Sequence, residues 1–241
     1  QYESRSTPHR SQLTSSMTHD TLYPRCIQMF YGEKIGYMST QIAVQPVTPS
    51  PVGQPGWPPQ GQWSYADYLR LPDDGRRYEI IEGVLYVANA PSYEHQYTVG
   101  EVAFALRLVV KQHQSGVVLE APFEVHLAEK TKAVQPDVLF IRTENQPAVG
   151  TQVFEGVPDL VVEVISPSSI RLDRTVKFDA YERAGVPEYW IVDPKARLVE
   201  VYTLARGEYA LLGQYTGDEI VTSQVLAGLQ VKASTLFLPT P

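Results

Sequence analysis

Cysteine is almost absent from this chain: among 241 residues, Cys26 is the single example. An internal disulfide is therefore excluded, and the cysteines define no zinc site, which fits a reducing compartment. No apolar run approaches the ~20 residues of a membrane-spanning helix, and the polar residues 1 to 37 lack the apolar segment of a secretory signal. We therefore expect a soluble, cytoplasmic protein that does not bind a membrane.

A surplus of basic residues is also missing, since the formal net charge is -7. This balance argues against a protein that coats nucleic acid without specificity. It does not exclude a nuclease, because carboxylates of an active site contribute negative charge that a bound metal offsets. The chain has neither a glycine-rich phosphate loop nor an internal repeat, which argues against P-loop hydrolases and solenoid proteins.

Proline is concentrated near the N-terminus, with six prolines between residues 46 and 59. Residues 1 to 37 are rich in polar side chains and show no sustained hydrophobic periodicity. We expect residues 1 to 60 to be a disordered or extended segment that ends in a proline-rich linker. We expect residues 61 to 241 to form one domain, because a hydrophobic content of 43% supports one substantial core.

The regular part of the chain alternates helical and strand patterns. Ser64 and Asp67 predict a short capped helix, and Gly83 predicts the turn of a hairpin. Helices are predicted near residues 93 to 114 and 170 to 184, the second ended by Gly185. Strands are predicted near residues 78–81, 84–87, 117–127, 136–141, 159–165, 188–193 and 197–203. This order predicts an α/β fold with a mixed central β-sheet flanked by helices.

Two acidic residues interrupt apolar strands. Asp137 precedes Val138-Leu139-Phe140-Ile141, and Glu163 follows Leu160-Val161-Val162. An ionised carboxylate in such a strand is costly unless a cation or several donors compensate it. Each acid alone has the alternative of a structural hydrogen-bond acceptor. Together, on neighbouring strands, they offer the oxygen ligands that Mg2+ prefers.

Lys177 lies on the apolar face of the predicted helix over residues 170 to 184. When successive residues are placed 100° apart, one broad apolar arc contains Ile170, Leu172, Val176, Ala180, Tyr181 and Ala184. Asp173 and Lys177 fall inside this arc. A lysine on a packed face must extend to solvent, pair with an acid or serve a site. Its position after Glu163 favours a role in the site.

In this order, Pro136-Asp137, Glu163 and Lys177 resemble the active site of the PD-(D/E)XK nuclease superfamily, and more closely the Uma family of bacterial restriction endonucleases. The resemblance covers about residues 63 to 205. Its further marks are Leu71-Pro72-Asp73-Asp74-Gly75 through Gly83, Ala90-Pro91-Ser92 followed by His95, Glu163-Val164-Ile165-Ser166-Pro167-Ser168, and Gly185-Val186-Pro187-Glu188-Tyr189-Trp190 through Pro194. It implies a restriction-endonuclease-like core, DNA as substrate, and Mg2+, or Mn2+, as the metal.

The resemblance also implies roles for single residues. The superfamily lysine stands two residues after the second acid, where this chain has Ile165, so Lys177 would replace it. Glu79 shares a strand face with Ile81. The resemblance implies that it is a further acid of the site, able to bind a second metal or orient a ligand, and the alternative is an ion pair with a nearby Arg or Lys. His95 lies on the apolar face of the long helix. The resemblance implies that it contacts the substrate or supports the metal ligands, and the alternative is a structural histidine held by hydrogen bonds.

These residues predict hydrolysis of DNA phosphodiester bonds. Asp137 and Glu163, with the carbonyl of Val164, would hold the metal, and Lys177 would orient water or stabilise developing charge. The alternative is a catalytically inactive nuclease-fold protein that binds DNA or a protein partner, which Ile165 keeps open. Cutting of both strands would favour a homodimer with two-fold symmetry.

Overall fold

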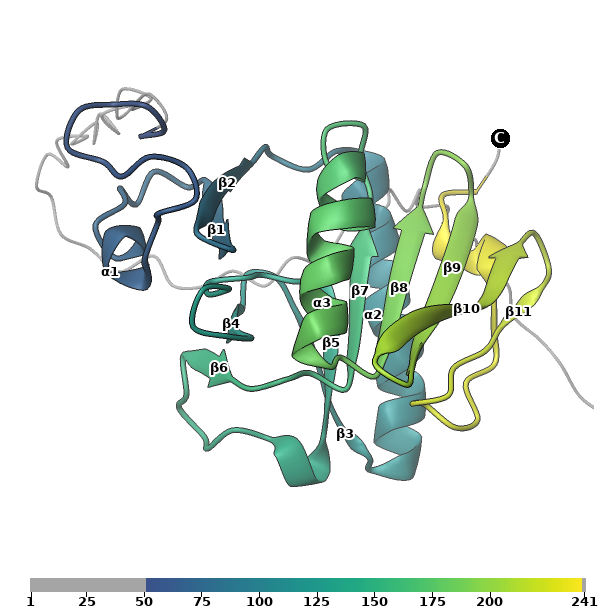
Figure 1. The fold of residues 1–241 in the computed structure, drawn as a ribbon. Helices are drawn as coiled ribbons and strands as arrows, with labels where there is room; N and C mark the ends of the chain where they lie inside the picture. Colours follow the sequence, from purple (N-terminus) through teal and green to yellow (C-terminus); the bar gives the residue numbers. More distant parts are fainter. Residues whose placement is uncertain (1–50, 240–241) are drawn as a thin grey trace, which may run out of the picture. The chain divides into compact units, whose positions relative to one another are not determined.

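Residues 51–239 are described by a computed structural model (Figure 1). They belong to one compact unit, Gln45–Pro241. Expectations for the polar N-terminal segment up to residue 50, including Cys26, lie outside the described residues.

A six-stranded sheet forms the centre of the unit, in the order β10-β9-β8-β7-β5-β3. Neighbouring strands are antiparallel except for β7 and β8, which run parallel. The strands are β3 Gly116–Glu120, β5 Val138–Arg142, β7 Leu160–Val164, β8 Glu188–Asp193, β9 Leu198–Ala205 and β10 Glu208–Thr216. The predicted α/β fold with a mixed central sheet is therefore confirmed.

Helices cover both faces of this sheet. A parallel pair of strands needs a crossover connection, and here the chain between β7 and β8 is helical from residue 170 to residue 184. Its first part is a π-helical segment, η2 Leu172–Lys177, which continues into α3 Phe178–Ala184. The long helix α2, Tyr93–His113, lies behind the sheet in Figure 1, with α3 in front.

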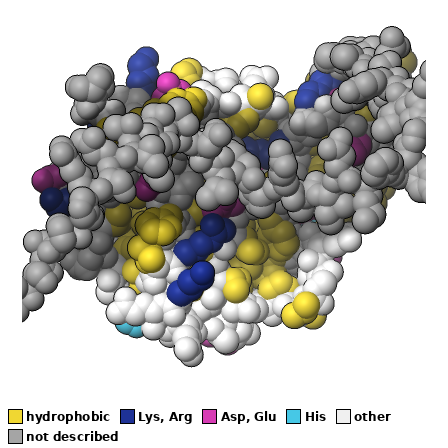
Figure 2. Space-filling view, turned by 180° about the vertical axis from the view of Figure 1, so that it is seen from behind, with side chains coloured by type: hydrophobic (Ala, Val, Ile, Leu, Met, Phe, Trp, Pro, Cys, Tyr) yellow, Lys and Arg dark blue, Asp and Glu magenta, His cyan; other side chains and the backbone are white. Residues whose placement is uncertain are grey.

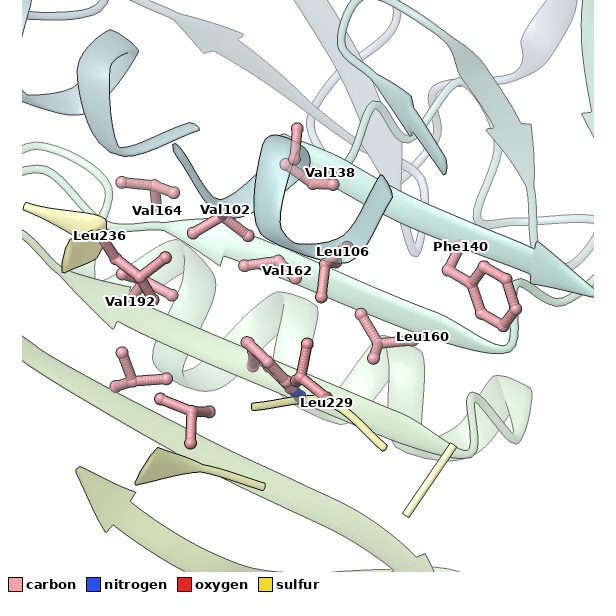
Figure 3. Packing of buried hydrophobic residues seen from close by; sticks show 14 of the residues in the cluster. Val102, Leu106, Val138, Phe140, Leu160, Val162, Val164, Val192, Leu229 and Leu236 are labelled. Atoms are coloured by element: carbon pink, nitrogen blue, oxygen red, sulfur yellow. The ribbon is translucent and has the colours of Figure 1, made fainter. Parts of the chain in front are cut away.

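Strand alternation divides the core into two layers. Val138 and Val162 belong to the cluster that contains Val102 and Leu106 of α2, as Figure 3 shows. Leu139 belongs to the cluster on the side of α3, together with Val161, Tyr181 and Tyr189. Side chains on one strand thus face different helices, and the odd-numbered positions of β5 and β7 face α3.

The N-terminal part of the unit is the hairpin of β1 Arg77–Ile81 and β2 Val84–Ala88. Gly83 makes its turn at φ 73°, and a Cβ added there would lie 2.6 Å from the carbonyl oxygen of Gly61. The short helix α1, Tyr65–Tyr68, begins with the predicted capping box of Ser64 and Asp67. Smaller elements are β4 Glu124–His126, β6 Val153–Glu155, β11 Ile220–Val221, β12 Val231–Lys232, η1 Thr143–Asn145 and η3 Ala233–Leu236.

Several details differ from the sequence-based prediction. The strand expected over residues 117 to 127 is divided into β3 and β4, with Pro122 between them. The edge strand β10 was not predicted, because much of it is exposed and it lacks a buried apolar face. Ile170, placed by periodicity on the packed face, is 43% exposed. Helical periodicity fails there because the following turn is π-helical rather than α-helical.

Hydrophobic side chains also lie on the outer face of α2, where Phe104 and Leu108 are exposed. The view from behind in Figure 2 shows hydrophobic groups beside Lys and Arg side chains on this side of the protein. No helix within residues 51–239 is long and apolar enough to cross a bilayer.

Residues 51 to 60, expected in the linker, contact the hairpin. The ring of Trp57 stacks on Trp63 with centroids 5.4 Å apart. Two hydrogen bonds of 2.9 and 2.8 Å join the side chain of Gln60 to the backbone of Leu85. A domain boundary near residue 60 thus stays a prediction, and these contacts attach Trp57 and Gln60 to the folded unit.

Two truncations test this boundary. A chain that begins at residue 51 should unfold cooperatively with the stability of the full chain, because the deleted segment has the composition of a disordered one. A chain that begins at residue 61 should lose roughly 1 to 3 kcal/mol, since it lacks the Trp57 stack and the Gln60 hydrogen bonds. Urea unfolding measures both, and equal stability of the two chains would contradict the role of residues 51 to 60.

Candidate functional site

Asp137 and Glu163 lie opposite each other where β5 begins and β7 ends. In the antiparallel register Val138 pairs with Val162, so the next position outward matches Asp137 with Glu163. The backbone N–H of Val164 donates a hydrogen bond of 3.0 Å to Oδ2 of Asp137. Asp137 is 3% exposed and Glu163 is 1% exposed, so both carboxylates are buried in the sheet.

Asp137 is compensated by basic groups from two other elements. Nη1 of Arg77, on β1, donates to Oδ1 at 3.0 Å, and Nε2 of His95, on α2, lies 3.3 Å from Oδ2. Burial alone would raise the pKa of Asp137, but the His95 hydrogen bond and the Arg77 charge hold it below its usual value. Asp137 is therefore ionised at neutral pH.

Glu163 accepts two hydrogen bonds on the same oxygen, Oε1. Nζ of Lys177 lies 2.9 Å away and the hydroxyl of Tyr181 lies 2.7 Å away. Burial raises the pKa of Glu163 to about 8, and the nearby acids Asp137, Asp173 and Glu79 raise it further against the opposing charge of Lys177. No hydrogen bond from residues 51–239 reaches the other oxygen, Oε2.

The ammonium of Lys177 lies among three carboxylates. Besides Glu163, Nζ is 3.1 Å from Oε1 of Glu79 and 3.9 Å from Oδ1 of Asp173. Burial lowers the pKa of Lys177, but these carboxylates outweigh burial and raise it above its usual value. The backbone N–H of Gln135 also donates to Oε1 of Glu79 at 2.7 Å. Lys177 is thus a permanent cation that connects β1, β7 and its own helix.

Two charged residues of the π-helical segment are buried on one face of the helix. Within Leu172–Lys177, Asp173 is 3% exposed and Lys177 is 1% exposed. A π-turn contains an extra residue relative to an α-turn and occurs often at functional sites. Burial raises the pKa of Asp173 to about 6.

Acids outnumber cations at this site, because Glu79, Asp137, Glu163 and Asp173 face Lys177 and Arg77, with His95 beside them. Carboxylate oxygens are the donor type that Mg2+ prefers. A carboxylate offers about four acceptor positions, and Oε2 of Glu163 is not used by the hydrogen bonds above. The donor set therefore fits a hard cation, although residues 51–239 hold no ready cluster of three or more metal-ligating His, Cys, Asp or Glu side chains.

A cleft of about 1080 Å³ opens onto these side chains. Arg77, His95, Asp137 and Glu163 line it, together with Lys177. Its walls include residues 89–92 before α2 and residues 166–169 after β7. A ligand can thus reach the acid pair from solvent.

All five residues selected from the sequence meet in this region: Glu79, His95, Asp137, Glu163 and Lys177. Ile165, at the usual lysine position, is 4% exposed and packs in the cluster on the side of α3. By alternation it lies on the same face of β7 as Glu163, the face that Lys177 approaches.

Sequence reasoning missed Arg77, Asp173 and Tyr181 as members of the site. Arg77 stands two residues before Glu79, so strand alternation places both side chains on one face, a signal that was available. Asp173 precedes Lys177 by one turn and lay in the same predicted arc. The Tyr181 hydrogen bond has no signal in the sequence, because an aromatic residue in an apolar arc reads as core.

Comparisons with known proteins agree with this geometry. The family described as Uma2, "Putative restriction endonuclease", matches residues 65–236. The chain belongs to the Uma2 family. This confirms the resemblance found in the sequence.

Two known proteins are also similar to this chain. An uncharacterized protein from Synechocystis sp. is 24% identical over 155 residues, which cover 64% of this chain and 87% of that protein. A crystal structure from Anabaena variabilis, titled as a putative nuclease belonging to DUF820, has a TM-score of 0.63 at 20% identity. It covers 72% of this chain and 97% of its own, and it shows a shared fold.

The raised pKa values of Glu163 and Asp173 predict a pH-dependent stability. An acid with a raised pKa in the folded state stabilises the fold at low pH and loses that contribution as pH rises through the folded pKa. Without divalent metal, the free energy of unfolding should therefore fall between about pH 5 and pH 8, the window given by about 6 for Asp173 and about 8 for Glu163. Urea unfolding in EDTA across this range measures it.

The Glu163→Gln variant is the control for this prediction. Because glutamine does not ionise in this pH range, the decline of the free energy of unfolding above pH 6 should become shallower. An equal slope in both proteins would show that Glu163 titrates at its ordinary pH.

Proposed function

We propose that this protein is a metal-dependent endonuclease that hydrolyses phosphodiester bonds of DNA. The observation that carries the proposal is the in-register pair of Asp137 and Glu163 with the ammonium of Lys177 2.9 Å from Glu163. Two acids and one lysine in this relation, in a chain of the Uma2 family, support a nuclease site.

Asp137 and Glu163 would hold Mg2+, or Mn2+, with the backbone carbonyl of Val164. When bound, the metal lowers the pKa of its water and neutralises charge on the phosphate. Asp137 is kept ionised by Arg77 and His95, so it is ready as a ligand at neutral pH. Glu163 would contribute Oε2, since Oε1 already accepts from Lys177 and Tyr181.

Lys177 and Glu79 complete the site. Lys177 fixes the orientation of Glu163 and lies where it can orient the attacking water or stabilise developing negative charge. Glu79 supports Lys177 at 3.1 Å and is a further acid for the metal. His95 would support the metal site by orienting Asp137, since its Nε2 lies 3.3 Å from Oδ2 of that residue. Its buried Nδ1 has no hydrogen-bond partner in the described part of the chain.

The alternative is an inactive nuclease fold that binds DNA or a protein partner. One observation favours it: the ammonium of Lys177 is surrounded by carboxylates and 1% exposed, so it is less available to a substrate than an open lysine. Plasmid cleavage by purified protein with Mg2+ or Mn2+, compared with EDTA, separates the two functions. If the enzyme cuts both strands, a homodimer would pair two such sites, which sedimentation tests.

Asp137→Asn should abolish Mg2+-dependent cleavage, because the amide removes an anionic ligand from the metal site. The matched control is Asp159→Asn. Asp159 is a buried carboxylate at the opposite end of the same strand pair, where it accepts from the N–H of Arg142 at 2.9 Å. Plasmid relaxation and linearisation should continue in the control, and activity of Asp137→Asn at the wild-type level would remove Asp137 from the site.

Lys177→Met tests whether Lys177 takes the role of the lysine that the superfamily places two residues after its second acid. Cleavage should fall by a factor on the order of 10² or more, the loss typical of a positioned electrostatic or proton-transfer group. Stability should also fall by about 3 to 5 kcal/mol, because the buried carboxylates lose their cation. Rates must therefore be measured at a temperature where the variant is folded, as judged by circular dichroism.

Ile165→Lys in the Lys177→Met background asks whether a lysine at the usual superfamily position can replace Lys177. Partial recovery of cleavage is expected, because residues 163 and 165 share a face of β7. Near-normal cleavage by Lys177→Met alone would contradict a catalytic role and favour the inactive-fold alternative or another base such as His95.

A further inference from the structure

Arg77 is the cation of the site that a ligand in the cleft can reach. Its side chain is 28% exposed, whereas the side chain of Lys177 is 1% exposed. Both residues line the cleft, but Lys177 directs its ammonium toward carboxylates. A substrate anion that enters the cleft therefore meets Arg77 before it meets Lys177.

The guanidinium of Arg77 keeps donors for a second partner. A guanidinium carries five N–H donors in a planar fork. In residues 51–239 the side chain makes one hydrogen bond, from Nη1 to Oδ1 of Asp137 at 3.0 Å. Such a fork matches two oxygens of a phosphate, a geometry that lysine cannot provide.

Asp137 does not depend on Arg77 alone. Its other oxygen accepts from the N–H of Val164 at 3.0 Å and lies 3.3 Å from Nε2 of His95. When a metal neutralises this carboxylate, the attraction between Arg77 and Asp137 weakens while these two contacts hold the carboxylate in place. Arg77 can then turn from the acid toward the substrate.

The backbone at Arg77 is rigid enough to aim the side chain. Arg77 pairs with Ala88 across the hairpin, and Glu79 on the same strand face is anchored by Lys177 and the N–H of Gln135. A substrate-binding side chain on a strand is positioned more accurately than one on a loop.

We propose that Arg77 binds the non-bridging oxygens of the phosphate that is cleaved. This assignment rests on the proposed nuclease function and names the group that recognises its substrate. Of the two permanent cations of the site, the more exposed one contacts the substrate phosphate.

Three variants test the assignment. Arg77→Met should lower kcat/KM for DNA cleavage by a factor on the order of 10² to 10³, the loss typical of one preorganised donor to an oxyanion. Arg77→Lys keeps the charge but not the fork, so it should recover part of the rate. Arg76→Met is the matched control, because Arg76 is 24% exposed, precedes Arg77 and pairs with Asp74. The Arg76→Met variant should lower kcat/KM by less than about tenfold, the effect expected from removing a single charge near the DNA.

A modified substrate gives a readout that a purely structural role would not move. After the cleaved bond has been mapped, a methylphosphonate at that phosphate replaces one charged oxygen with a methyl group. The modification should slow the wild-type enzyme and the Arg76→Met variant by a larger factor than it slows Arg77→Met, because that variant has already lost one contact to the phosphate. Equal slowing of all three proteins would overturn the proposal.

Binding separates this proposal from the nuclease function itself. Anisotropy with a labelled duplex should show weaker binding of Arg77→Met than of Arg76→Met in Ca2+, with a smaller difference in EDTA, where Asp137 holds Arg77. If the wild type cleaves no DNA, the proposed function fails while this comparison still tests Arg77. Equal affinities of the two variants in Ca2+ would contradict the contact. Circular dichroism checks that each variant is folded.

Discussion

The buried ammonium of Lys177 is the constraint on which the rest of the structure depends. Glu79 from the hairpin, Glu163 from the central sheet and Asp173 from the crossover helix all approach it. Loss of the cation would leave these buried acids uncompensated, which is costly. The same charge therefore joins three separate elements of the fold, and Lys177 stands at the end of the π-helical segment Leu172–Lys177.

A comparison of buried acids shows what distinguishes a site from a structural contact. Glu188, on β8, is also completely buried, but four donors satisfy it: the indole N–H of Trp190, the hydroxyl of Ser223 and the backbone N–H groups of Gln224 and Val225. All of its acceptor positions are thus occupied by neutral groups. Glu163 instead receives two donors on one oxygen and none on the other within the described residues, and it lines a cleft. Unused acceptor capacity beside a cleft, rather than burial, marks the acid that can bind a ligand.

Local sequence patterns predicted much of this arrangement because the patterns are themselves local. Alternation and capping located the hairpin, α2, the crossover helix and the strands that carry Asp137 and Glu163. The pairing of Arg77 with Asp137 joins positions 60 residues apart, and nothing in either segment specifies the other. Glu188 occupies an apolar strand just as Glu163 does, so sequence alone could not tell a satisfied acid from an available one. The exposure of Ile170 was missed because a π-turn changes the helical phase without a recognisable residue signature.

The antiparallel pairing of β5 and β7 has a consequence for how such sites diverge. The chain leaves β5 at Arg142 and returns to β7 at Leu160, both at the end of the strands remote from the acids. Segments inserted between Asp137 and Glu163 are added to that distant end, so the number of residues between the two acids is free to drift among relatives. The interval between Glu163 and the lysine is not fixed either, because Lys177 reaches Glu163 from the crossover helix, whereas the superfamily places its lysine on the strand itself. Spacing is thus an unreliable signature for both intervals, and the meeting of the side chains in space is the feature to compare.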